Sequence, residues 1–358
     1  MPRLRRVDCA SPGIRRVRRG RGFSYEWPDG SKVTEPDVLD RIAGLVLPPA
    51  WTDVWICSDS RGHIQAVGTD AAGRRQYRYH DDWRTQRDAE KHERVLAFAR
   101  RLPRARLQVE QHLDQRGVTR DRVLATAFRL LDLGFFRVGS ESYAEENGTY
   151  GLATMRREHV GVRGDVVTFD YTAKSGKQRI QALVDPGVRK VVVALLKRDD
   201  PSEELLAYKD RAGWHDVTST EINGYLREVL GAEVSAKDFR TWHATVLTAV
   251  GLAVSTIPTS ASARRRAVAR VVSEVAHYLG NTPAVCRSSY IDPRVIDLYD
   301  DGITISRSLH RLGDDADFGQ PAHHGQIEAA VLRLLRSPAK AAQRRTPARA
   351  STLGHRAA

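Results

Sequence analysis

Residues 279–294 read LGNTPAVCRSSYIDPR, and this stretch organises the prediction for the whole chain. The preceding run, Ala267 to Leu279, carries apolar residues at helical spacing, which predicts a helix with one buried face. Gly280 is typical of the residue that ends a helix, and Pro283 predicts that the helix does not resume at once. The sequence therefore indicates a buried helix, a sharp turn and then a short segment that presents side chains.

That segment places Tyr290 between two arginines, Arg287 and Arg294, nine residues after Asn281. A phenol is a poor nucleophile at neutral pH, but neighbouring guanidinium groups favour its ionised form and attract an anionic substrate. On this stretch alone, a packed amphipathic tyrosine is the commoner explanation. The rest of the chain decides between the two.

The composition points to a polyanionic partner. The 358 residues include 57 Lys and Arg against 44 Asp and Glu, which gives a net charge of +13. Such a balance favours nucleic acid over an anionic membrane surface. No apolar run approaches the 18 residues of a membrane span, and the basic start lacks the apolar region of a secretory signal. Three widely spaced cysteines fit a reducing cytoplasm, and the one near the tyrosine, Cys286, is expected to be a buried structural thiol.

The first part of the chain predicts a small, mostly antiparallel β domain at residues 22–83, after a basic arm at residues 1–21. The arm carries eight arginines and is either a flexible solubilising segment or a source of phosphate contacts. A hairpin is expected over 22–34 and a helix over 37–45. Further strands are predicted at 54–57, 63–69 and 74–79.

The last of these strands interleaves cations and aromatics. Gln76 shares one face with Arg78, and Tyr77 shares the other with Tyr79. Arginines on such a strand can contact phosphates, and amides can contact base edges. A strand that packs its tyrosines on a core, with its arginines reaching outward, explains the same pattern slightly better.

From residue 84 the pattern becomes mainly helical, which predicts a second domain over 84–312. Helix 120–133 ends at Gly134, and Arg137 follows at the mouth of the next helix. Strands form a three-stranded meander whose Lys174–Lys177 turn presents two lysines. A C-terminal extension, 313–358, holds one amphipathic helix and a basic tail expected to be disordered. The helices are expected at 84–101, 107–116, 120–133, 186–197, 220–230, 237–255, 262–279 and 326–335, and the meander strands at 160–163, 166–171 and 178–184.

Four cationic features match what phosphoryl transfer needs: Arg137, Lys174, Arg240 and the arginines beside Tyr290. Two guanidinium groups can bind the non-bridging oxygens bidentately. An ammonium among other cations gives up its proton more readily and can protonate a leaving oxygen. The Asn281 amide can complete the oxyanion site. No metal is required if these groups supply the charge, and no phosphate-binding glycine loop of the ATPase type is present.

The segments FFRVGSE, YTAKSGK, SAKDFRTWHAT and LGNTPAVCRSSYIDPR, in this order, resemble the bacterial and poxvirus-like type IB DNA topoisomerases. The resemblance covers roughly residues 20–310. It implies a two-lobed clamp on duplex DNA, made of the β domain and the α-helical catalytic domain. It also implies a monomeric cytoplasmic enzyme, associated with the nucleoid. Such an enzyme relaxes supercoils without ATP, with divalent cations not essential and at most stimulatory.

The resemblance assigns roles to individual residues. Tyr290 corresponds to the nucleophile that becomes linked to a DNA 3′-phosphate, and Arg137 and Arg240 correspond to the two catalytic arginines. Lys174 corresponds to the general acid for the 5′-oxygen, although Lys177 on the same turn could compete. The remaining matches support the site or touch DNA in such enzymes, and they are Lys237, Gln76, Tyr77, Tyr79, Tyr143 and Thr154.

One position departs from the family pattern, because Asn281 stands where many members have histidine. Asparagine can donate a hydrogen bond to a non-bridging oxygen but cannot transfer a proton. A hydrogen-bonding role is therefore expected here. If the family's histidine carried an essential proton, this enzyme would be slow or inactive.

Two other functions remain as alternatives. A tyrosine site-specific recombinase shares the arginines and the tyrosine, but it usually has histidine where this chain has Lys237, and its first domain is helical. A non-catalytic DNA-binding protein could retain the same scaffold. The sequence argues against this alternative, because the four expected catalytic positions all carry residue types suited to catalysis: Arg137, Lys174, Arg240 and Tyr290.

Overall fold

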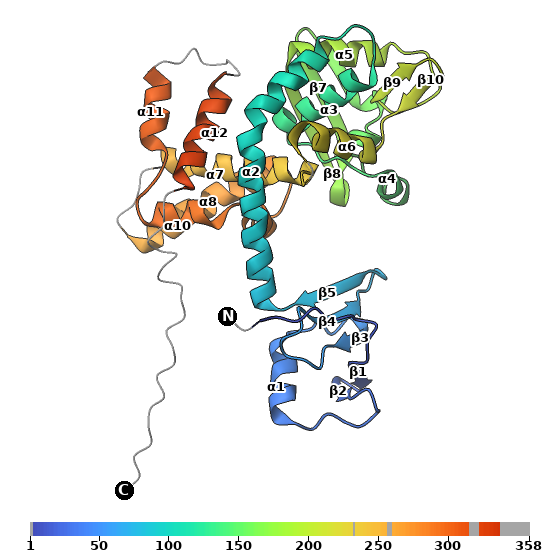
Figure 1. Ribbon diagram of the computed structural model, residues 1–358, viewed down its shortest axis with the longest axis vertical. Coiled ribbons are helices and arrows are strands. Elements are labelled where there is room, and N and C mark those ends of the chain that lie inside the picture. Colours follow the sequence, from blue (N-terminus) through green and yellow to red (C-terminus); the bar gives the residue numbers. More distant parts are fainter. Residues whose placement is uncertain (1–2, 232, 256–259, 315–321, 337–358) are drawn as a thin grey trace. The chain divides into compact units, whose positions relative to one another are not determined.

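The computed structural model describes residues 3–231, 233–255, 260–314 and 322–336 (Figure 1). The chain divides into two compact units, Met1–Glu93 and Arg94–Ala358. The division falls within a long helix, α2 (Asp81–Leu113), whereas the sequence suggested a boundary between residues 83 and 84. No helix in the described ranges is long and apolar enough to cross a membrane.

The first unit is a five-stranded antiparallel sheet with helix α1 (Pro36–Gly44) and the first turns of α2. This confirms the predicted small β domain. Its core is formed by apolar side chains from the strands and the helix, including Ile14, Ile42 and Ile56. In the order β2-β1-β3-β4-β5, the strands are Gly22–Glu26, Ile14–Arg19, Thr52–Ile56, Ile64–Thr69 and Arg75–Tyr79.

The predicted hairpin over residues 22–34 is confirmed at its turn, but it is short. The Trp27 N–H donates to the Ser31 carbonyl at 2.8 Å, and Glu26 lies opposite Lys32 in an isolated antiparallel bridge. The main partner of β2 is instead β1, from Arg15 opposite Glu26 to Arg19 opposite Gly22. Residues 14–19 are therefore part of the sheet and not a flexible arm. Arginines can sit on an exposed strand when their guanidinium groups find partners. That of Arg16 donates to two backbone carbonyls and stacks on the Phe23 ring at 4.3 Å.

The second unit is mainly helical and contains the predicted three-stranded meander, in the order β6-β7-β8. These strands are Val160–Arg163, Val166–Ala173 and Lys177–Val184. A second, two-stranded sheet of β9 (Ala207–Asp210) and β10 (Gly213–Asp216) was not predicted. The helices are α3 (Arg120–Gly134), α4 (Glu141–Asn147), α5 (Pro186–Leu196), α6 (Ser219–Leu230), α7 (Ala236–Val254), α8 (Ala261–Leu279), α9 (Pro283–Ser289), α10 (Pro293–Asp300), α11 (Ser306–Asp314) and α12 (Ala322–Leu334).

Helix α7 forms the centre of this unit. Its Phe239 and Trp242 are fully buried, and the Phe239 ring meets Phe98 and Phe128 edge to face, at centroid distances of 4.8 and 5.2 Å. Edge-to-face aromatic pairs add stabilisation beyond their buried area. The helix is therefore held firmly from the α2 and α3 sides, and side chains at its N-terminal end have a rigid base.

The prediction of two helices, 84–101 and 107–116, is also wrong, because α2 continues through Pro103. Proline inside a helix costs about 3 kcal/mol. Leu102, Ala105 and Val109 are all buried on both sides of it, so one apolar face continues across the proline. Packing of that face outweighs the local cost.

Around the tyrosine, α8 ends at Gly280, whose φ of 63° confirms the predicted stop. Pro283 does not prolong the turn but is the first residue of α9, where a missing N–H is harmless. Helices α10 and α11 were not predicted. The tail from residue 337 lies outside the described residues, so its expected disorder stays a prediction.

Candidate active site

Five of the predicted residues line one cavity of about 450 Å³ in the second unit: Arg137, Lys174, Lys237, Arg240 and Tyr290. They come from the segment before α4, from the β7–β8 turn, from α7 and from the end of α9. Their side chains bring four cations to one phenol. The convergence on which the sequence-based hypothesis depended is therefore present.

Tyr290 is the residue that ends α9, and it is half-buried. The turn upstream is fixed by Thr282, whose hydroxyl caps α9 by accepting from the Val285 N–H. Beneath it, Cys286 is fully buried, and burial raises the pKa of its thiol to about 11, which confirms a structural cysteine. The tyrosine ring lies 5.3 Å from the guanidinium carbon of Arg240. The end of α9 thus places the Tyr290 phenol next to the Arg240 guanidinium.

Arg240 is buried, and its guanidinium donates to two backbone carbonyls, those of Phe135 at 2.8 Å and Leu279 at 2.7 Å. These bonds fix its plane. Burial, and next the nearby charge of Arg137, lower its pKa to about 10. The lowered pKa corresponds to a cost of about 3 kcal/mol for keeping the group charged at neutral pH. A bound phosphate would offset that cost, so the site is prepared for an anion.

The Phe135 carbonyl reaches Arg240 because Phe135 itself adopts a left-handed backbone, with φ of 56°. The sequence placed the helix break at Gly134, which is instead the last residue of α3. A Cβ on Gly134 would lie 2.3 Å from the Phe136 ring, so the glycine is required for close packing and not for its φ. A left-handed non-glycine residue is strained and occurs often at functional sites.

Arg137 and Asn281 are held together. The Arg137 Nη2 donates to the Asn281 Oδ1 at 2.7 Å. Since arginine can only donate, this bond requires the amide oxygen to face Arg137 and leaves the amide nitrogen on the other side. That nitrogen is buried and has no hydrogen-bond partner within the described chain. An unsatisfied buried donor is costly, and it is suited to an incoming anionic oxygen.

The backbone of Arg137 is fixed by a crossing of two glycines that the sequence did not reveal. Leu152 and Ala153 donate backbone hydrogen bonds to the carbonyls of Arg137 and Val138, at 2.9 and 2.8 Å. This brings Gly139 and Gly151 together. A Cβ on Gly151 would lie 2.5 Å from the Cα and the nitrogen of Gly139, so only glycine fits.

We expect a Gly151→Ala variant to lose about 1–3 kcal/mol of unfolding free energy from this overlap. The resemblance implies that Arg137 acts in DNA cleavage, so the variant should also cleave DNA about 100-fold more slowly, because Arg137 is displaced. Thermal melting and single-turnover cleavage measure the two effects. Gly161→Ala is the matched control, since a Cβ there meets nothing within 4 Å. A Gly151→Ala enzyme that cleaves as fast as the wild type would show that the crossing does not position Arg137.

Lys174 is exposed and lines the cavity from the β7–β8 turn, whereas Lys177 is the first residue of β8 and is not part of that lining. The turn is attached to helix α8 by Arg179, which donates to the carbonyls of His277 at 3.3 Å and Tyr278 at 2.7 Å. Basic side chains at a helix C-terminus satisfy its last carbonyls. Arg179 thereby ties the lysine turn to the segment that carries Asn281.

Lys237 lies exposed in the first turn of α7, which begins with a capping box between Ser235 and Asp238. Asp238 is buried and also pairs with Arg94 at 3.2 Å. Asn223 from α6 and Ser235 also line the cavity, and neither was predicted. The Ser-x-x-Asp spacing was the one feature of the sequence that could have identified Ser235, since this spacing marks the start of a helix.

The predicted DNA-contact residues differ in exposure. Tyr77, 45% exposed, stacks with Tyr79 at a centroid distance of 6.1 Å, so both lie on one face as expected. The Gln76 amide donates to Asp70 at 2.9 Å. Thr154 is only 4% exposed and accepts from the Gly151 N–H, so it supports the glycine crossing and does not offer a surface contact. The side chain of Tyr143 lies outside the described part of the structure.

Comparison with known families matches this architecture in both units. A family model described as the catalytic core of eukaryotic DNA topoisomerase I matches residues 80–309, and one described as the N-terminal domain of bacterial DNA topoisomerase IB matches residues 22–70. The chain belongs to the type IB DNA topoisomerase family. The resemblance identified from the four sequence motifs is thus confirmed, and the enzyme is a type IB DNA topoisomerase, an isomerase that acts on DNA.

Individual relatives agree. A DNA topoisomerase 1B of Acanthamoeba polyphaga mimivirus is 27% identical over 340 residues, which covers 91% of this chain and 95% of the relative. The DNA topoisomerase 1B of vaccinia virus (strain Copenhagen) is 22% identical over 237 residues, 66% of this chain and 72% of the relative. A DNA topoisomerase 1 of Schizosaccharomyces pombe is 32% identical over 129 residues, 36% of this chain and 15% of the relative. These matches favour the topoisomerase over the recombinase alternative.

Proposed function

We propose that the enzyme relaxes supercoiled duplex DNA by cutting and resealing one strand through a covalent bond between Tyr290 and a DNA 3′-phosphate. The observation that carries this proposal is the single cavity lined by Arg137, Lys174, Arg240 and Tyr290. The Tyr290 Oη attacks phosphorus and loses its proton to solvent, while the bond from phosphorus to the 5′-oxygen breaks and Lys174 gives that oxygen a proton. In the reverse step, the 5′-hydroxyl returns its proton to Lys174 and attacks the phosphorus, and the tyrosine leaves and regains a proton from solvent.

The two arginines bind the non-bridging phosphate oxygens, where negative charge is concentrated in the transition state. Arg240 is held in place by backbone carbonyls before DNA arrives, and Arg137 is oriented by its bond to Asn281. The amide nitrogen of Asn281 supplies a further donor. Because these groups are fixed in advance, little reorganisation is needed when the phosphate enters.

The reaction needs neither ATP nor a metal in this proposal. Cleavage exchanges one phosphodiester for another, so the energy of the broken bond is kept in the phosphotyrosyl link. The cations of the cavity supply the charge that a metal would otherwise provide. Between the two steps the free 5′ end rotates and releases superhelical strain.

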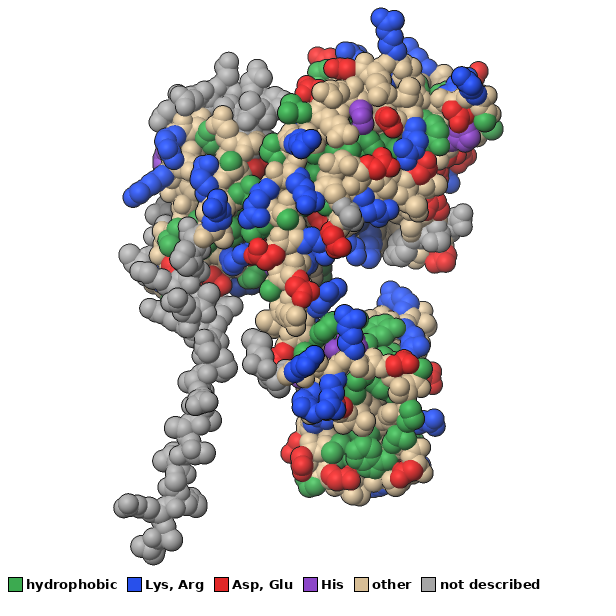
Figure 2. Space-filling model, in the orientation of Figure 1, with side chains coloured by type: hydrophobic (Ala, Val, Ile, Leu, Met, Phe, Trp, Pro, Cys, Tyr) green, Lys and Arg blue, Asp and Glu red, His purple; other side chains and the backbone are tan. Residues whose placement is uncertain are grey.

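Duplex DNA is bound by both units, which close around it as a clamp, and the enzyme acts as a monomer at the nucleoid. The net charge of +13 favours a polyanion, and Figure 2 shows Lys and Arg side chains on the visible face of each unit. The stacked pair Tyr77 and Tyr79 offers aromatic surface to the DNA. Lys237 offers a cation in the cavity lining, and Lys177 offers one at the start of β8.

We expect the enzyme to relax a supercoiled plasmid in the presence of EDTA and without ATP. Agarose gels of a time course measure this directly. Strand exchange between two specific sites, without relaxation, would favour the recombinase. Binding without any relaxation would favour a non-catalytic scaffold. A requirement for ATP or for a divalent ion would contradict the proposal that the cations of the cavity supply all the charge that the reaction needs.

The general-acid role of Lys174 predicts a specific rescue. A Lys174→Ala variant should cleave about 10²–10⁴-fold more slowly, since the 5′-oxygen must leave unprotonated. A substrate with sulfur in place of that oxygen has a better leaving group and should regain most of the rate. Single-turnover cleavage of both substrates measures the rescue. The same two substrates are cleaved with Lys177→Ala for comparison. A rescue seen only in the Lys177→Ala variant would assign the general-acid role to Lys177.

A further inference from the structure

A cluster of buried charges outside the cavity joins four helices of the second unit. The Arg106 guanidinium from α2 donates to both carboxylate oxygens of Asp132 on α3, at 2.8 Å each. It also donates to both oxygens of Glu328 on α12, at 2.5 and 3.0 Å. The Trp242 Nε1 on α7 donates to the Glu328 Oε1 at 2.9 Å. A single guanidinium thus serves two carboxylates, and one of these also accepts from the central helix.

The cluster is withdrawn from solvent. Asp132 and Glu328 are 1% and 3% exposed, and Trp242 is fully buried. Charged side chains are almost never buried to this degree unless they are paired, and losing one partner leaves the others uncompensated. None of these residues lines the active-site cavity, and the mechanism above does not use them.

Two residues of the cluster, Asp132 and Trp242, lie close in sequence to Arg240 or to the residue whose carbonyl binds it. Asp132 lies three residues before Phe135, whose carbonyl accepts from Arg240. Trp242 lies two residues after Arg240 on α7. Between these arms, the buried His243 lies 3.9 Å from Asp132 and stacks edge to face with Phe135 at 5.0 Å. The contacts that hold Glu328 therefore fix the helix of Arg240 and the carbonyl that orients its guanidinium.

Helix α12 lies beyond residue 309, where the match to the catalytic-core family model ends. We propose that α12 nevertheless supports the active site from outside the cavity, with Glu328 acting as a positioning residue for Arg240. This inference rests on the role proposed above for Arg240. It assigns a function in cleavage to the described part of the C-terminal extension.

The test is a double-mutant cycle on the full-length chain. Glu328→Gln keeps the shape, but an amide nitrogen cannot accept from Arg106. We expect it to slow single-turnover cleavage about tenfold in the wild-type background and less than about twofold in an Arg240→Lys background, because residues that act through one another are not additive. The Kd for an uncleavable duplex should stay unchanged. Glu274→Gln, the same change at an exposed position on α8, is the control.

Melting curves establish that each variant is folded at the assay temperature. Trp242→Phe provides a second variant, which removes the donor to Glu328 together with part of the buried indole ring. An equal slowing in both backgrounds, or no slowing at all, would overturn the proposal. So would unfolding of both variants, which would make the cluster a stability element alone. An Arg240→Lys enzyme that cleaves at the wild-type rate would instead contradict the proposed role of Arg240. This single variant therefore distinguishes a failure of that proposed role from a failure of the positioning role of Glu328.

Discussion

A Tyr290→Phe enzyme is expected to bind duplex DNA normally and to form no covalent adduct with it. The change removes only the attacking oxygen, whereas the ring can keep its place 5.3 Å from the Arg240 guanidinium. Loss of a nucleophile lowers the rate of the chemical step by about 10⁴-fold or more. Trapping end-labelled DNA under denaturing conditions measures capture, and a gel-shift titration at fixed salt measures binding.

Tyr299→Phe is the matched control, since it removes the same atom from a tyrosine that is fully buried. Its hydroxyl has no hydrogen-bond partner among the described residues, so the variant should fold and capture DNA as the wild type does. Capture retained by Tyr290→Phe would place the nucleophile elsewhere. Peptide mapping of the adduct would then identify the linked residue and the strand end.

Arg240→Lys should reduce the cleavage rate by about 10²–10³-fold, although the charge is conserved. The guanidinium bonds two carbonyls, of Phe135 and Leu279, while it faces the cavity. A lysine ammonium is a point charge that cannot make these contacts and bind a phosphate in the same plane. The expected loss is that of one transition-state donor. Single-turnover cleavage at saturating enzyme measures it without a contribution from binding.

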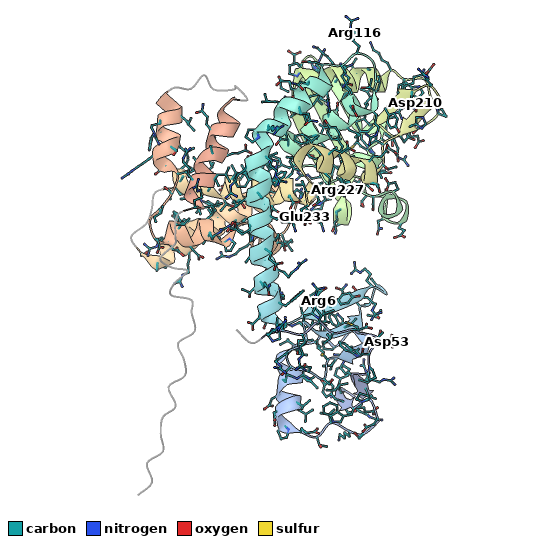
Figure 3. The ribbon with its side chains drawn as sticks, in the orientation of Figure 1. Arg6, Asp53, Arg116, Asp210, Arg227 and Glu233 are labelled. Carbon is teal, nitrogen blue, oxygen red and sulfur yellow. The ribbon has the colours of Figure 1, made fainter. Side chains whose placement is uncertain are left out.

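The control for this change is Arg116→Lys, at an exposed position that Figure 3 shows at the opposite end of the second unit from α4. It should leave cleavage unchanged. An Arg240→Lys enzyme with nearly wild-type cleavage would show that a positive charge is sufficient at this position. The fixed plane of the guanidinium would then have no catalytic value.

Much of the second unit could be predicted from local patterns. Helices α7 and α8 and the meander follow from apolar periodicity, and Gly280 ends α8 as expected. The errors lie where distant contacts outweigh the local signal. Pro103 remains inside α2 because the helix face around it is buried, and β1 forms because its backbone pairs with β2 and with β3, which lies far along the chain.

The residues of the cavity were identified from their types and order, through the four motifs. Their geometry was not available in the same way. Nothing near Asn281 indicates that its oxygen faces Arg137, 144 residues away. Nor does the sequence distinguish the buried Glu328 from the many glutamates that lie in solvent.

The order of residues along the chain was thus sufficient for the family, the nucleophile and the cations around it, because helix ends, turns and motifs depend on neighbours within a few positions. The folded molecule was needed to reveal the glycine crossing behind Arg137, the carbonyls that hold Arg240 and the link from α12 to α7. These features depend on close packing and on charges removed from water. Such interactions form between segments that are remote in sequence, so no local pattern records them.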